Sequence, residues 1–172
     1  MTRNELLRTI EILFWEQSFS DLSMDAIAKK LDMKKASLYY HFPSKESMFL
    51  AVLEYSYETY KKKYQSILGM DNLQESIQEM ITFPYREKNL FSIVSQKWYC
   101  QIQEIEIWMR EKNTTIQNQV CIVYSEKYNW NTVRNMLFFS LIDGLAKRCC
   151  REQCEQKDLE LVLSEIIELF FV

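Results

Sequence analysis

Hydrophobic side chains recur at helical spacing along most of the chain. Near the N-terminus, Leu6, Ile10 and Leu13 follow Thr2 and Glu5, a pair typical of a capping box, which predicts a helix to about residue 17. Only two glycines and two prolines occur among the 172 residues, and so few helix breakers favour long helices over strands and turns. The pattern predicts an all-α fold.

The pattern after the first helix predicts a helix-turn-helix. Two short helices are expected over residues 24–31 and about 34–40, separated by a tight turn at Asp32. Ser44 is expected to begin a long fourth helix, which ends near Gly69. A helix before the short pair and a long helix after it complete the module.

The remaining chain also shows only helical patterns, with no repeat and no flexible linker. Helices are predicted over residues 72–82, 87–111, 114–124, 131–152 and 158–171, and Pro84 is expected to end the first of these. We therefore divide the chain into a three-helix head, residues 1–46, and a helical body, residues 47–172, joined through the long fourth helix.

Charge is distributed unevenly along this arrangement. The whole chain has a formal net charge of -3, yet residues 29–45 carry five lysines and one acid, a local charge of +4. A basic head on an otherwise acidic chain concentrates the attraction for phosphate in one place. Three of these lysines, Lys34, Lys35 and Lys45, lie on or after the second helix of the pair, where a reader of the DNA major groove needs them.

The last two predicted helices carry more apolar residues than one core-facing stripe requires. This excess favours burial against a second copy of the chain, and a central core helix in a monomer is the alternative. The residues expected at a dimer interface are Leu137, Leu141, Leu145, Leu159, Leu163, Ile166 and Phe170.

A family resemblance rests on residues 20–50. Ile27-Ala28, a turn, the run Ser37-Leu38-Tyr39-Tyr40-His41-Phe42 and Lys45 resemble, in type and spacing, the DNA-binding head of the tetracycline-repressor (TetR) family. Two positions depart from the family pattern: Asp32 stands where glycine is usual, and Lys34 stands where a Ser or Thr cap is usual. Leu141-Ile142-Asp143-Gly144-Leu145 is weakly similar to part of the family's eighth helix.

The resemblance implies a homodimer that binds a double-stranded DNA operator through the head. Lys35 and Ser37 would face base edges, Tyr39 and His41 base or phosphate, and Tyr40 phosphate. Lys45 would grip phosphate from the start of the fourth helix, while Leu38 and Phe42 would be core. The full set of expected DNA-binding residues is Ser23, Lys34, Lys35, Ser37, Tyr39, Tyr40, His41 and Lys45.

The resemblance also implies a regulator, and we expect a ligand-responsive repressor. An activator, or a sensor or interaction protein whose head has lost operator readout, are the alternatives. An apolar or aromatic effector is the expected ligand, although aromatic residues at helical spacing also serve as plain core. The candidate pocket residues are Phe83, Phe91, Trp98, Tyr99 and Trp108.

Other chemistry is not expected. His41 is the only histidine, and the sequence contains no nucleophile–histidine pair, phosphate loop or metal-ligand cluster, so we predict no enzyme activity, cofactor or metal. Whether Cys149, Cys150 and Cys154 have a redox or soft-metal role is left open. The charged N-terminus and the lack of a long apolar run predict a cytoplasmic protein without a membrane partner.

Overall fold

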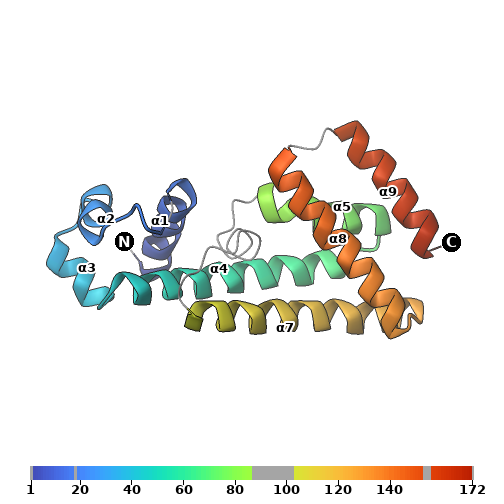
Figure 1. Cartoon of the computed structure of the whole chain (residues 1–172), viewed down its shortest axis with the longest axis horizontal. Coiled ribbons are helices and arrows are strands. Elements are labelled where there is room, and N and C mark those ends of the chain that lie inside the picture. The colour runs from blue at the N-terminus through green and yellow to red at the C-terminus, as the bar shows by residue number, and fades with distance from the viewer. Residues whose placement is uncertain (1, 18, 87–102, 153–155, 172) are drawn as a thin grey trace. The chain divides into compact units, whose positions relative to one another are not determined.

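The structure is a computed structural model that describes residues 2–17, 19–86, 103–152 and 156–171. These residues form helices and no strand, so the predicted all-α fold is confirmed for the part of the chain described. The helices, labelled in Figure 1, are α1 (Arg3–Glu16), α2 (Met24–Lys30), α3 (Lys35–His41), α4 (Lys45–Leu68), α5 (Leu73–Arg86), α7 (Gln103–Tyr128), α8 (Thr132–Glu152) and α9 (Gln156–Phe171). None of the helices within those ranges is long and apolar enough to cross a membrane.

The chain divides into two compact units, and the division falls inside α4. The first unit holds the described residues through Tyr60, and the second holds those from Lys61 on. The compact unit around the head therefore extends beyond residue 46, because the first half of α4 supplies part of its core. Buried there are Leu6, Ile10 and Phe14 of α1, Ile27 of α2, Leu38 of α3, and Met48, Phe49, Val52 and Leu53 of α4.

Local capping explains where the helices of the head begin. In α1 the Thr2 amide donates to Glu5 Oε2 at 2.6 Å and the Glu5 amide donates to Thr2 Oγ1 at 3.3 Å, which is the predicted capping box. The Ser44 and Ser47 hydroxyls exchange the same kind of bond before α4, each accepting from the other's amide at 3.0 Å. These bonds satisfy amides that would otherwise lack partners at the helix starts.

The turn between α2 and α3 survives the replacement of glycine by Asp32. Asp32 adopts a left-handed backbone with φ 51°. Its amide donates to Lys29 O at 3.3 Å, and the Met33 amide donates to Ala28 O at 2.9 Å. This pair of bonds is a Schellman motif, which requires a left-handed residue at the position that Asp32 occupies. Aspartate tolerates that conformation better than most residues, so the predicted turn forms with a moderate conformational cost.

The second unit is built from α5, α7, α8 and α9 together with the end of α4. Within it, α5 packs on α8 and α9, and α7 packs on α8. An aromatic cluster links three of these helices: the Phe138 ring lies 5.1 Å from the rings of both Tyr124 and Trp130 and 5.3 Å from that of Phe170. Burial raises the pKa of the Tyr124 hydroxyl well above its ordinary value.

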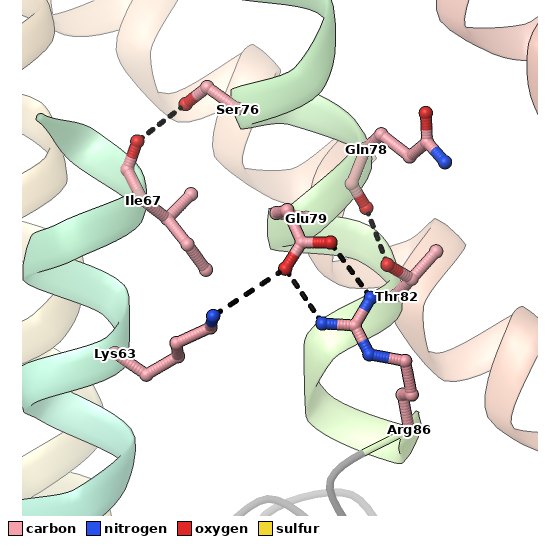
Figure 2. Close-up of polar contacts among 7 residues, drawn as sticks. All are labelled: Lys63, Ile67, Ser76, Gln78, Glu79, Thr82 and Arg86. Carbon is pink, nitrogen blue, oxygen red and sulfur yellow. Dashed lines mark hydrogen bonds and ion pairs between the residues drawn. The ribbon is translucent and has the colours of Figure 1, made fainter. Parts of the chain in front are cut away.

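Polar bonds join the end of α4 to α5 (Figure 2). The Ser76 hydroxyl donates to Ile67 O at 2.9 Å. Further along α5, both Arg86 terminal nitrogens donate to the Glu79 carboxylate at 2.8 Å, and Lys63 Nζ of α4 lies 3.9 Å from the same carboxylate. The hydrogen bonds from Arg86 hold the pKa of Glu79 below its ordinary value.

Two predicted helix boundaries were wrong. Residue 84 does not end α5, which continues to Arg86. Proline removes one backbone donor, and the Glu79–Arg86 pair spans that position on the same helix. The break expected near residue 113 is also absent, because α7 is continuous there. The hydroxyls of Thr114 and Thr115 donate back to Arg110 O and Glu111 O at 2.9 Å, so these polar residues sit within the helix.

The expected apolar interface on α9 requires a correction. Its stripe is already buried inside a single chain, where it packs towards α5 and α8, so it belongs to the core of the second unit. The four residues concerned are Leu159, Leu163, Ile166 and Phe170, each at most 6% exposed. In contrast, Leu137 of α8 is 60% exposed, and Leu141 and Leu145 are half-buried.

Candidate nucleic-acid interface

Helix α3 presents one anchored side and one exposed side. Leu38 is fully buried and Phe42, just after the helix, is 2% exposed, as expected for core residues. The helix packs against α2, and these two side chains fix its rotation. The exposed side chains that result are Lys34, Lys35, Ala36, Ser37, Tyr39, Tyr40 and His41.

The aromatic side chains of this surface are available to a partner. Tyr40 is 86% exposed and Tyr39 is 41% exposed, which is unusual for large rings unless they have a contact to make. The His41 ring is also exposed and lies edge-on to the Tyr40 ring at 5.6 Å. Rings with a polar tip, beside lysines, combine hydrogen bonding with attraction for phosphate, as a DNA reader needs.

Lys35 is held by an acidic residue that the sequence interpretation did not single out. Its Nζ lies 2.7 Å from Asp25 Oδ1 of α2, and 5.9 Å from the centroid of the Tyr39 ring. The hydrogen bond to Asp25 raises the pKa of Lys35 above its ordinary value. Both side chains are more than half exposed, so the pair contributes little to stability.

Ser23 and Lys34 both occupy helix starts. The Ser23 hydroxyl accepts from the Ala26 amide at 3.1 Å and caps α2, which leaves its own hydrogen for another acceptor. Lys34 is the N-cap of α3 and makes no side-chain cap bond. The sequence interpretation that the usual cap is lost at Lys34 therefore agrees with the structure.

Lys45 lies differently from the other expected contacts. Its Nζ donates to Phe19 O at 2.9 Å and to Leu22 O at 3.1 Å, and lies 4.2 Å from the centroid of the Phe19 ring. The ammonium group is thus turned onto the loop between α1 and α2. The phosphate contact that the resemblance implies for Lys45 stays a prediction, and the structure shows its ammonium group in contacts within the head.

Two of the five expected effector-pocket residues lie in the part of the chain that the structure describes. Phe83 is 2% exposed and belongs to the core, while Trp108 is half-buried with Lys112 Nζ 5.5 Å from its ring centroid. Phe91, Trp98 and Tyr99 lie outside the described residues.

A different hollow is present in the second unit, between α7 and α8. It has a volume of about 630 Å³. The sequence interpretation missed this groove because the polar residues that line it resemble a solvated helix face. The signal that could have found it is that many of these polar residues are small and recur at i, i+3 and i+4 spacing. The groove is lined by Gln117, Asn118, Cys121, Ile122, Ser125, Glu126, Thr132, Asn135, Met136, Phe139 and Ser140.

The cysteines give no sign of a metal site in the part described. Cys149 is buried, and burial raises the pKa of the half-buried Cys121 thiol, which disfavours the reactive thiolate. The side chains of Cys150 and Cys154 lie outside the described residues. Among the residues that the structure covers, no group of three potential ligands forms.

Known proteins match both the head and the whole fold. Residues 6–52 match the family described as bacterial regulatory proteins, tetR family. The biofilm operon icaADBC HTH-type negative transcriptional regulator IcaR of Staphylococcus epidermidis is 25% identical over 128 residues, covering 71% of this chain and 69% of that protein. IcaR of Staphylococcus aureus strain Newman is 40% identical over 47 residues, which are 27% of this chain and 25% of that protein.

The same likeness extends to a solved structure. A transcriptional regulator of the TerR/AcrR family from Aquifex aeolicus VF5 superposes with a TM-score of 0.73 at 20% identity, over 98% of this chain and 99% of the other. At that identity the superposition shows the fold alone. Residues 6–52 match the tetR family of bacterial regulatory proteins, and the chain is a transcriptional regulator that resembles IcaR of Staphylococcus epidermidis over most of its length.

Proposed function

We propose that this regulator is a repressor that binds a specific operator as a homodimer and releases it in response to a ligand. The exposed side of α3 carries the proposal: lysines, a serine, two tyrosines and a histidine are displayed while Leu38 and Phe42 hold the helix in place. Such a helix reads base edges in a major groove. Repression, rather than activation, is favoured by the staphylococcal relatives, which are named as negative regulators.

The operator test compares specific with non-specific binding. Fluorescence anisotropy of the protein against its own upstream DNA and against a scrambled duplex, across a salt series, separates the two. Tight binding to the upstream DNA alone supports the proposal. Equal and strongly salt-dependent binding to both, followed by failure of a random-sequence selection to enrich any motif, favours the alternative of a sensor whose head has lost readout.

The proposed dimer uses the exposed face of α8 in place of the buried stripe of α9. Val133 and Leu137 are each at least 60% exposed and lie four residues apart, on one side of the helix. Exposed apolar faces mark contacts with partners, and a twofold dimer presents the same face from each copy. Two heads in successive major grooves would then be about 34 to 36 Å apart.

Sedimentation velocity tests this dimer. Leu137→Asp places a charge in the proposed interface and is expected to yield monomers at micromolar concentration with unchanged helicity. Ile107→Asp is the matched control, because Ile107 is 49% exposed on α7, outside the proposed face. A dimeric Leu137→Asp protein places the interface elsewhere.

Ligand response is proposed to use the groove between α7 and α8. Its volume lies in the range of small-molecule sites. Amides and hydroxyls line it beside Ile122, Met136 and Phe139, which favours a ligand with an apolar part and several hydrogen-bonding groups over a purely aromatic one. Asn118→Trp, which fills the groove, is expected to abolish effector-driven release while leaving operator affinity unchanged. Release that persists in this variant excludes the groove as the effector site.

A further inference from the structure

We propose that Lys45 supports DNA binding as a positioning residue: it holds the loop between α1 and α2, and with it the start of α2, against the first turn of α4. The inference rests on the proposed function, since DNA affinity is one of its readouts. It replaces the phosphate contact that the family pattern assigns to this lysine.

The donors of Lys45 are engaged within the head. An ammonium group has three N–H donors, and two of them reach Phe19 O at 2.9 Å and Leu22 O at 3.1 Å. The face of the Phe19 ring lies 4.2 Å from Nζ, well inside the range of a cation–π contact. The side chain is half-buried. A phosphate that took either of the two paired donors would have to displace a contact that is partly shielded from water.

The loop that Lys45 holds is connected to the core on both sides. Phe19 packs on Phe14 of α1, with ring centroids 6.1 Å apart, and on Phe49 of α4, 4.9 Å apart. Leu22 is 1% exposed, so the second carbonyl belongs to a residue fixed in the core. Lys45 and Phe19 thus connect α1, the loop and α4.

These contacts of Lys45 lie next to the elements that support the DNA-reading surface. Leu22 immediately precedes Ser23, the cap of α2, and α2 packs against α3. A shift of the loop therefore moves the start of α2 and the support of the reading helix. Because a misplacement of about 1 Å weakens a contact that depends on geometry, loss of Lys45 is expected to reduce binding without removing a charge from the interface.

The salt dependence of operator affinity separates the two roles. Lys45→Met is expected to weaken operator binding at least about 10-fold at every salt concentration, with an unchanged slope of log affinity against log salt. Lys34→Met is the matched control, since Lys34 is an exposed lysine on the reading surface, and its loss is expected to lower the slope by about 0.9. A comparable fall in slope for Lys45→Met, or unchanged affinity, overturns the proposal.

Hydrogen exchange tests the clamp without DNA. In Lys45→Met the amides of residues 19–24 are expected to exchange at least about 10-fold faster than in the wild type, whereas Lys34→Met leaves them unchanged. Unchanged protection of this loop in Lys45→Met overturns the proposal even if the wild-type protein binds no specific operator. Should Lys45→Met fail to fold, Lys45→Gln, whose amide group can still donate hydrogen bonds but carries no charge, is measured in the same two ways.

Discussion

The head and the second unit use their side chains in opposite ways. Along α3 the buried residues are few, Leu38 and the adjacent Phe42, and the exposed ones carry the chemistry. In the second unit the distinctive residues are buried, above all the rings around Phe138. A surface that must meet an external partner constrains residue identity at each position, whereas a core constrains volume and polarity and accepts many combinations.

Phe138→Ala is expected to have the largest effect on stability, because it opens a cavity among packed rings. The loss should be about 3 to 5 kcal/mol in the free energy of unfolding. Chemical denaturation followed by circular dichroism measures it, and Ile107→Ala, at an exposed position of α7 outside the proposed interface, should change stability by less than about 0.5 kcal/mol. Similar values for the two variants would contradict the aromatic cluster as the core of the second unit.

His41→Ala or Tyr39→Ala is expected to lower operator affinity without lowering stability. Each removes an exposed group of the reading surface, so operator affinity should fall about 10- to 100-fold, equivalent to about 1 to 3 kcal/mol. The thermal unfolding midpoint and the oligomeric state should stay the same. Anisotropy measures the affinity, calorimetry measures the midpoint, and sedimentation velocity measures the oligomeric state. If His41→Ala unfolds the head instead, His41 is a structural residue and its assignment to DNA is wrong.

Glu79→Gln tests whether a polar group in the second unit matters for stability. It removes the charge that Arg86 and Lys63 share and is expected to cost about 1 kcal/mol, which lowers the unfolding midpoint by about 2 to 4 °C. Glu106→Gln, in the more exposed pair with Arg110, is the control and should have a smaller effect.

The Glu79 effect has a defined pH dependence. The folded pKa of Glu79 lies below its ordinary value of 4.5, so the ion pair stabilises the folded state above that pH and loses its contribution as the pH falls through the folded pKa. The difference between wild type and Glu79→Gln should be complete at pH 7 and shrink below about pH 4.5. A difference that grows on acidification would contradict the assignment.

Asp32→Gly is expected to have the smallest effect, and it acts on the head. Glycine removes the cost of the left-handed backbone at this turn but adds flexibility to the unfolded chain, so a net gain of about 0.5 kcal/mol is expected. Differential scanning calorimetry detects the corresponding rise in midpoint. Asp32→Ala, which keeps a side chain without the polar group, should be less stable than the wild type; the opposite order would mean that the turn is not strained.

Much of the head was predictable because its signals are local. Capping pairs such as Thr2 with Glu5, and the position of Leu38 within its helix, depend on residues a few positions apart. The orientation of Lys45 was not predictable, because its partners are carbonyl groups more than twenty residues away that any sequence would provide. The pairing of Asp25 with Lys35 was missed for a different reason: the two residues lie on different helices and meet only because α2 and α3 pack together.

The sequence predicted the helices of the second unit, but it did not predict which face of each helix is buried. Two apolar stripes on α9 gave no indication of which one a neighbouring helix would cover, and the covered one includes Leu163 and Ile166. Helix ends were also not predictable where a proline or a pair of threonines stood inside a helix. Threonine favours turns and caps as well as helices, and in α7 the Thr114 hydroxyl bonds back to Arg110 O within the helix.

The division of the chain inside α4 bears on any exchange of heads between related regulators. Val52 and Leu53 of α4 are buried in the first unit, while Tyr64 and Ile67 of the same helix are buried in the second. A chimaera joined after residue 46 would combine a head with a foreign half of its own core. A junction between Tyr57 and Tyr64 keeps each set of core residues with its native partners, and there the only requirement is that the helix continue unbroken.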